Sequence, residues 1–96
     1  MIPIAVVGMK LSFRIDEAYS LKDKRSVIKS IIHKMHRKFN ISIAELDKQD
    51  MLNQGVIGIS VVANEYQQCH TVLDKVLNEI EETYAIEVYN IERMEM

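Results

Sequence analysis

Apolar and polar positions along the chain follow two periods, which together predict four strands and two helices. Residues 2–15 alternate between apolar and polar or small side chains, as expected of a long strand. Residues 41–47 and 86–94 also alternate, and residues 56–63 form a β-branched run of strand length. The register of the last strand stays open, because its apolar side chains change faces midway.

Two stretches between these strands have the spacing of amphipathic helices. Ser20 is a suitable N-cap for the first helix, and Asn40 is a suitable left-handed residue for its end. Asn64, followed by Gln67 three residues later, predicts a capping box at the start of the second helix. The apolar stripes consist of Leu21, Ile28, Ile31, Ile32, Met35 and Phe39 in the first helix and of Cys69, Leu73, Val76, Leu77, Ile80 and Tyr84 in the second.

The order strand-helix-strand-strand-helix-strand predicts an α+β, ferredoxin-like split βαβ fold, an antiparallel four-stranded sheet with both helices on one face. Since the chain has 96 residues and no repeat or linker composition, we expect one domain over residues 1–96. Apolar side chains occur on both faces of residues 2–15 and 56–63, so the helix-free face should expose a hydrophobic patch. We therefore expect a homodimer that forms through this face or through a sheet edge.

The formal net charge of −2 conceals an uneven distribution along the chain. Residues 1–40 contain nine Lys or Arg and three Asp or Glu, whereas residues 65–96 contain two and eight. The single cysteine, Cys69, excludes an internal disulfide and suits a reducing cytoplasm, and its place on an apolar stripe predicts a small buried side chain. The longest uncharged run, residues 1–9, is too short for a membrane span and lacks the basic start of a signal peptide.

Cations gather at the start of the first predicted helix, where the helix macrodipole is already positive. In the predicted fold this helix start lies at the same end of the domain as the finish of the second helix. The cations therefore either pair internally with Glu79, Glu81 and Glu82 or bind an external anion such as RNA phosphate. The candidate anion-binding or RNA-binding residues are Lys22, Lys24, Arg25, Lys29 and Arg37.

Residues that could carry catalysis or hold a metal are few. Glu45 and Asp47 are expected on one face of the second strand with Asp50 following, and a polar strand edge is the preferred interpretation over acid–base chemistry. His33 and His36 have a spacing compatible with metal binding, but no third ligand accompanies them. Glycine-rich phosphate loops and nucleophile elbows do not occur. We therefore expect a protein that is not an enzyme and that uses no metal or cofactor.

Residues 20–25, with the sequence SLKDKR, resemble the S-L-K-x-K-R signature of the YlxP-like family, a bacterial family of unknown function. The similarity continues through residues 37–45, in the polar residues Gln49 and Asp50, and in residues 58–64, and it becomes weaker after about residue 66. Two features depart from the family: Leu52 stands where an aromatic residue, usually Trp, is frequent, and the glycine that many members have near position 17, here Glu17, is missing.

The resemblance implies a small ferredoxin-like domain encoded near translation-initiation and ribosome-maturation genes, and hence a ribosomal RNA or ribosome partner. It implies no established activity. The polar residues that match the family pattern outside the first helix are Glu45, Gln49 and Asp50. We therefore expect a cytoplasmic, non-enzymatic accessory protein that binds RNA or the ribosome through the first helix. The alternative is a self-associating structural or regulatory domain with no nucleic-acid role.

Overall fold

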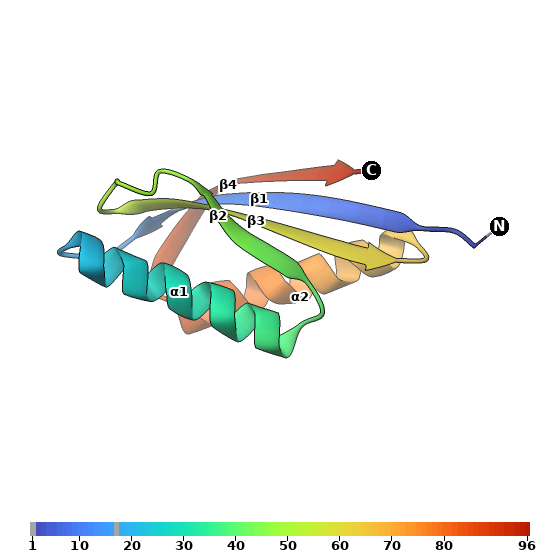
Figure 1. Cartoon of the computed structure of the whole chain (residues 1–96), viewed down its shortest axis with the longest axis horizontal. Helices are drawn as coiled ribbons and strands as arrows, with labels where there is room; N and C mark the ends of the chain where they lie inside the picture. Colours follow the sequence, from blue (N-terminus) through green and yellow to red (C-terminus); the bar gives the residue numbers. More distant parts are fainter. Residues whose placement is uncertain (1, 17) are drawn as a thin grey trace.

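The computed structural model describes residues 2–16 and 18–96 and confirms the α+β, ferredoxin-like fold (Figure 1). The four strands form one antiparallel sheet in the order β2-β3-β1-β4. None of the helices in the described part of the chain is long and apolar enough to cross a membrane. The elements are β1 (Ala5–Ile15), α1 (Leu21–Lys38), β2 (Ser42–Asp47), β3 (Gln54–Ala63), α2 (Tyr66–Thr83) and β4 (Ile86–Glu95).

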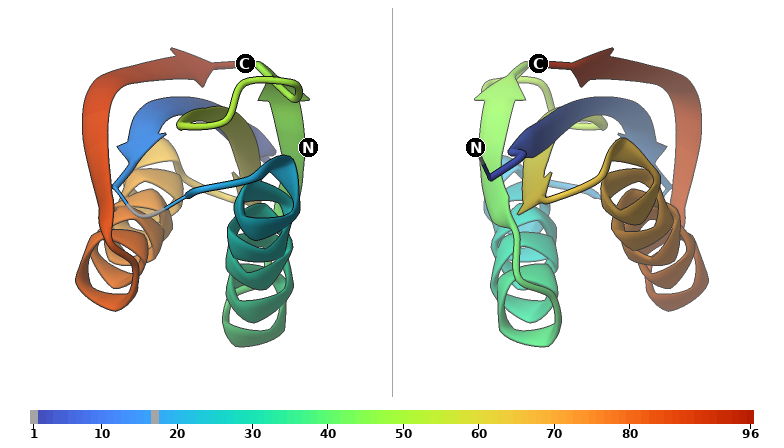
Figure 2. Two further views of the ribbon diagram at one scale, coloured as in Figure 1. Left: turned by 90° about the vertical axis from the view of Figure 1, so that its left-hand side faces the viewer. Right: turned by 90° about the vertical axis from the view of Figure 1, so that its right-hand side faces the viewer.

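Both helices cover the same face of a curved sheet, and the core lies between the two layers (Figure 2). Every second residue of β1 points toward the helices, because side chains alternate across a strand. Burying each of these large apolar side chains stabilises the fold by about 1.5–3 kcal/mol. The core residues of the central strands and the helices are Ala5, Val7, Met9, Leu11, Phe13, Ile15, Ile57, Ile59, Val61, Ile28, Ile31, Met35, Cys69, Leu73, Val76 and Ile80.

The helix ends confirm one of the three predicted caps. The Ser20 hydroxyl accepts a hydrogen bond from the Asp23 N–H at 3.1 Å, as expected of an N-cap. The prediction for Asn40 is wrong, because α1 ends at the extended residue Phe39. The capping box at Asn64 is also wrong, because α2 begins one residue later than such a box requires and Glu65 is its N-cap without a side-chain bond.

A bulge in β4 resolves the register that the sequence left open. Ser12 pairs with Asn90 and Phe13 with Val88, so Tyr89 is an extra residue in β4. Ile91 on one side of the bulge and Val88 on the other therefore both face the helices. The extra residue shifts the alternation of apolar positions in β4, while the face turned toward the helices stays the same. Val88 is partly buried against the core on this face, whereas Ile91 is 45% exposed.

The helix-free face of the sheet is less apolar than predicted. On β1 this face carries Lys10 and Arg14, which pair with Glu92 at 3.0 Å and Glu87 at 2.9 Å on β4. The expected hydrophobic patch is therefore interrupted on β1 by charged side chains, because the alternation of the strand places its larger apolar side chains on the helix side. Apolar surface on this face lies in a groove at its centre, described below, and at the end of the β1–β3 pair, where Val62 is 65% exposed opposite Val6.

Gly55 provides a test of how closely α1 approaches the sheet. A Cβ atom at this position would lie 2.9 Å from the ring of Phe13 and 3.1 Å from Ile28 Cδ1, and both of these side chains are fully packed. We expect Gly55→Ala to lower the free energy of unfolding by about 1–3 kcal/mol through overpacking, as measured by urea denaturation.

Gly8→Ala is the matched control on the neighbouring strand. Its added methyl group would meet Met96 Cε at 3.5 Å, which is ordinary contact. We expect this variant to change stability by less than about 0.5 kcal/mol. Equal losses in the two variants would show that the effect comes from strand glycines in general and not from the contact between α1 and the sheet.

Candidate functional site

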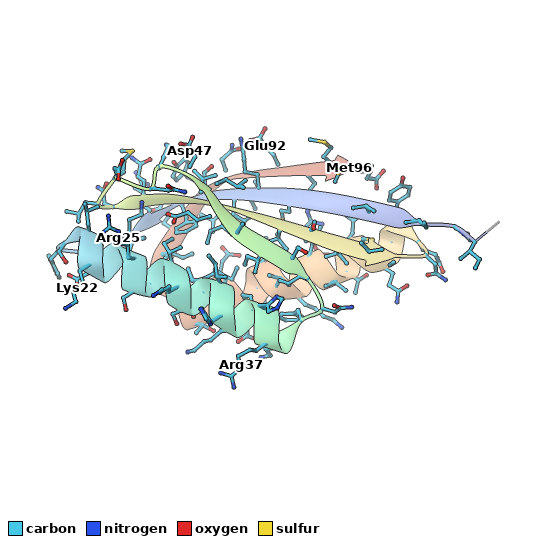
Figure 3. The ribbon with its side chains drawn as sticks, viewed as in Figure 1. Lys22, Arg25, Arg37, Asp47, Glu92 and Met96 are labelled. Atoms are coloured by element: carbon cyan, nitrogen blue, oxygen red, sulfur yellow. The ribbon has the colours of Figure 1, made fainter. Side chains whose placement is uncertain are left out.

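A groove of about 630 Å³ lies between the N-terminal half of α1 and the connection from β2 to β3. Three cations line its α1 wall, and three polar side chains from β2 and the connection line the opposite wall. Figure 3 shows Arg25 on the side of α1 that faces this connection. Six residues that the sequence analysis named separately are thus brought together in one place: Lys22, Arg25 and Lys29 with Glu45, Gln49 and Asp50.

Lys24 does not belong to this surface, because its side chain is completely buried behind it. Its ammonium donates a hydrogen bond to the backbone carbonyl of Lys48 and lies 3.8 Å from the Glu45 carboxylate. The prediction that Lys24 contacts an external anion is therefore wrong, because a buried ammonium cannot reach a ligand in the groove. Lys24 instead ties α1 to the β2–β3 connection, and so fixes the distance between the two walls of the groove.

The environment of Lys24 shifts its protonation equilibrium. Burial lowers the pKa of its ammonium from the ordinary value of 10.5, since removal from water disfavours the charged form. The carboxylates of Glu45 and Asp50 oppose this effect, and the neighbouring Arg25 adds to the lowering. The acidic side chains of the groove thus help to keep the buried lysine charged.

The cations of the groove are not neutralised by the end of α2. Lys38, at the other end of α1, pairs with Glu79 at 2.6 Å, and this hydrogen bond lowers the pKa of the Glu79 carboxyl. Among residues 2–16 and 18–96, Lys22, Arg25 and Lys29 form no ion pair. The reason is an offset between the helices, since the first turns of α1 extend beyond the last turn of α2 (Figure 1).

Arg37 lies apart from the other candidate cations. It is exposed near the C-terminal end of α1 and borders a separate hollow shared with Lys34 and Glu79. Figure 3 shows its side chain directed away from the sheet. Arg37 follows Lys22 by 15 positions, which correspond to about 22 Å along a helix, so one small ligand cannot contact both.

The paired carboxylates of β2 are separated by a bulge. Glu45 pairs with Ile57 and Asp47 with Val56, so Leu46 is an extra residue and the two acids face opposite sides of the sheet. The expectation that Glu45 and Asp47 share a face is therefore wrong. Figure 3 shows Asp47 on the helix-free side of the sheet, away from α1. Within the described residues, no group of three or more His, Cys, Asp or Glu side chains could hold a metal ion.

Cys69 is buried as predicted, and its thiol contacts the carbonyl oxygens of Ala5 and Val61 at 3.6 Å. His70 points elsewhere and forms no dyad with it. The Nε2 atom of His70 lies 2.8 Å from Glu95, and its Nδ1 atom lies 3.0 Å from Arg93. These contacts join α2 to the edge strand β4.

The fold and the groove define a small ferredoxin-like α+β protein with a mixed-charge groove beside its first helix. The sequence profile of the family described as "Protein of unknown function (DUF503)" matches residues 6–93, and the chain belongs to this family. It is 38% identical over 71 residues to "Uncharacterized protein YlxP" from Bacillus subtilis (strain 168), covering 74% of this chain and 77% of that protein. The resemblance to the YlxP-like family is thereby confirmed.

Solved structures with similar folds have little sequence identity to this chain. A de novo designed protein with a ferredoxin fold matches with a TM-score of 0.54 and 16% identity, covering 93% of this chain and 82% of the design. A C-terminal segment of the alpha subunit of aIF2 from Pyrococcus abyssi matches with a TM-score of 0.54 and 11% identity over all of this chain. This chain spans about half of that segment, 51%. At these identities the similarity establishes the fold alone.

Three features of the site are not predicted from the sequence. They are the apolar floor of the groove at Ile28 and Ile32, the left-handed backbone of Lys48 with a φ of 57°, and the burial of Lys24. The spacing of Leu21, Lys24 and Ile28 did contain a signal for the burial of Lys24, since these residues share one helix face. Nothing in the sequence signals the conformation of Lys48, because lysine has no preference for positive φ.

Lys24→Met tests the role of the buried ammonium. The variant keeps an unbranched side chain but leaves the Lys48 carbonyl without its donor. We expect the free energy of unfolding to fall by about 1–3 kcal/mol, as measured by urea denaturation. Lys22→Met is the control, since it removes an exposed lysine two residues away and should change stability by less than about 0.5 kcal/mol.

The pH dependence of this effect has a defined sign. Between the lowered pKa of folded Lys24 and 10.5, the unfolded chain retains a proton that the folded protein has released. The contribution of Lys24 to stability therefore increases with pH in this window, and below it the penalty for burying the charge is present in full. We expect the unfolding free energy of wild type to increase relative to that of Lys24→Met as the pH approaches 10.5. A difference that stays constant over the alkaline range would contradict the lowered pKa.

Proposed function

We propose that this protein is a cytoplasmic, non-enzymatic accessory protein that binds RNA, including ribosomal RNA, through the groove beside α1. The observation that carries this proposal is that Lys22, Arg25 and Lys29 line one groove and form no ion pair with any described residue. Cations without internal partners at a helix start, where the macrodipole already disfavours them, are stabilised by an external anion. The family's association with translation genes supports RNA as the source of that anion.

The three cations follow one another along the α1 wall at intervals of three and four residues. They therefore extend over about 10 Å of helix, enough to contact neighbouring phosphates of a nucleic-acid backbone. Contacts of this kind are electrostatic, depend strongly on salt, and do not by themselves distinguish one sequence from another. Arg37, about two turns beyond Lys29 along α1, would contact a more distant part of the same RNA.

Arg25→Gln tests this proposal. Loss of one phosphate contact is expected to weaken binding to an RNA hairpin with an unpaired loop by about tenfold and to reduce the slope of log affinity against log salt by about one. Fluorescence anisotropy of the labelled hairpin at several salt concentrations provides the measurement. Lys75→Gln is the matched control, because it removes the same charge from an exposed position on α2, outside the groove.

We expect Lys75→Gln to bind like wild type within a factor of about two. A wild-type affinity that does not change with salt, or equal losses in the two variants, would contradict binding through the groove. The first result would exclude phosphate contacts, and the second would indicate that only the total charge of the protein matters.

Self-association is a second candidate function, and the helix-free face of the sheet favours it. A second groove, of about 640 Å³, crosses this face over a floor that includes Gly8, Ala44 and Gly58. Leu46, which contacts Gly58, and Met94 line this groove and are 53% and 65% exposed. Apolar side chains so exposed beside a shallow floor of small residues would be buried by the same face of a second copy.

Ala44→Glu places a charge on the floor of this second groove. We expect wild type to form a dimer at micromolar concentration and Ala44→Glu to be monomeric, because an unpaired buried carboxylate is strongly disfavoured. Light scattering coupled to size exclusion measures both masses. Gln68→Glu on the exposed surface of α2 is the control and should remain dimeric. A monomeric wild-type protein would contradict this function.

A further inference from the structure

The groove beside α1 contains more than a site for phosphate, because its two walls carry opposite charges. The α1 wall presents cations, whereas the wall from β2 and the β2–β3 connection presents Glu45, Gln49 and Asp50. The partly buried Ile32 forms most of an apolar floor between them, and the nearly buried Ile28 lies beneath it with 4% of its surface exposed. A plain polyanion would bring its phosphates next to two carboxylates, which repel them.

The two walls do not neutralise each other. No ion pair joins Lys22, Arg25 or Lys29 to Glu45 or Asp50. Glu45 is partly covered and lies beside the Lys24 ammonium, while Asp50 is exposed and free to accept hydrogen bonds. The groove is therefore complementary to a ligand that carries negative charge at one end and hydrogen-bond donors at the other, with a flat apolar part between.

Hydrogen bonds of Lys24 and Lys48 hold the acidic wall of the groove in place. The buried Lys24 ammonium bonds to the carbonyl of Lys48, the residue immediately before Gln49 and Asp50. Lys48 also donates its Nζ hydrogen bonds to Gln54 at 2.8 Å and to Tyr89 at 3.1 Å. These contacts anchor the connection on both sides of the sheet, so the Asp50 carboxylate is presented from a fixed backbone.

We propose that this groove binds a guanine nucleotide. The phosphate lies against Lys22, Arg25 and Lys29, and the base lies on the apolar floor with its Watson–Crick edge toward Asp50. The nucleotide is either an unpaired guanosine of a bound RNA or a free guanine nucleotide. In the first case the inference rests on the proposed function, and in the second it does not. A volume of about 630 Å³ is sufficient for one nucleotide.

The chemistry of the acidic wall selects guanine among the four bases. A carboxylate only accepts hydrogen bonds, and it accepts two of them side by side. Guanine presents two adjacent donors, N1–H and the N2 amino group, on its Watson–Crick edge. Adenine and cytosine place a ring-nitrogen acceptor beside their amino group, and uracil places acceptors on both sides of N3–H, so each of them also directs a lone pair at the carboxylate. The amide of Gln49, next to Asp50, can donate to the guanine O6 oxygen.

Titrations followed by NMR or calorimetry test this inference with two kinds of ligand. The free-nucleotide arm compares guanosine, inosine and adenosine 5′-monophosphates with inorganic phosphate. The RNA arm compares two hairpins that differ only in one unpaired loop base, guanine or adenine. We expect at least about a tenfold preference for guanine over adenine in one or both arms, since one bidentate base contact discriminates to this extent. Inosine keeps N1–H but lacks the amino group, so its affinity should fall between the other two.

Asp50→Asn and Asp47→Asn form a matched pair of variants. Both remove one negative charge from neighbouring exposed positions, but Asp47 lies on the opposite side of the sheet from the groove. We expect Asp50→Asn to reduce the guanine preference to about twofold or less without weakening the binding of adenine ligands. Asp47→Asn should retain the full preference.

The outcomes separate this inference from the proposed function. Guanine preference only in the hairpins identifies an RNA residue as the ligand, and preference for the free nucleotide without hairpin binding supports the groove but contradicts RNA binding. Salt-dependent hairpin binding with no base preference overturns the inference and leaves the proposed function intact. An unchanged preference in Asp50→Asn, or an equal loss in Asp47→Asn, also overturns it.

Discussion

The site of this protein depends on one buried ammonium group. Lys24 occupies a core position on α1 and donates a hydrogen bond to the Lys48 carbonyl in the β2–β3 connection. Removing this charge from water costs free energy, which the Lys48 carbonyl and the Glu45 carboxylate partly offset. An apolar residue could fill the same space, but it could not specify where the connection lies. The lysine thus supplies the donor that the buried Lys48 carbonyl requires, and it defines the position of the groove's acidic wall.

The position of the contact between α1 and α2 determines which cations of α1 lack a partner on α2. The two helices contact each other near the C-terminal ends of both, where Lys38 pairs with Glu79 and Ser30 bonds to the hydroxyl of Tyr84 at 2.8 Å. The N-terminal half of α1 therefore has the sheet and the β2–β3 connection as neighbours, and α2 does not reach it (Figure 1). Its cations are left beside the polar side chains of the connection. Opposite charges thus share a groove without forming ion pairs.

The two faces of the sheet have different roles: the face covered by the helices contributes the core, and the opposite face is available for contacts with other molecules. The helix side holds a continuous core, from Ala5 at one end of β1 to Ile15 at the other. The opposite side carries ion pairs between β1 and β4 that are about half exposed and so contribute little to stability. Between them lies a shallow groove over Gly8 and Gly58, where a closely approaching surface would meet little obstruction.

The sequence by itself determined the order of elements, the ferredoxin-like topology, the Ser20 cap and most of the core, because these depend on local periodicity and on hydrogen bonding between near neighbours. It also identified Lys22, Arg25 and Lys29, along with Glu45, Gln49 and Asp50, but as two unrelated groups. Only the tertiary structure brought them together, since residues some 20 positions apart meet through the packing of α1 against β2. The burial of Lys24 and the bulges at Leu46 and Tyr89 were likewise decided by tertiary contacts, because a bulge changes which face a side chain takes without changing the residues themselves.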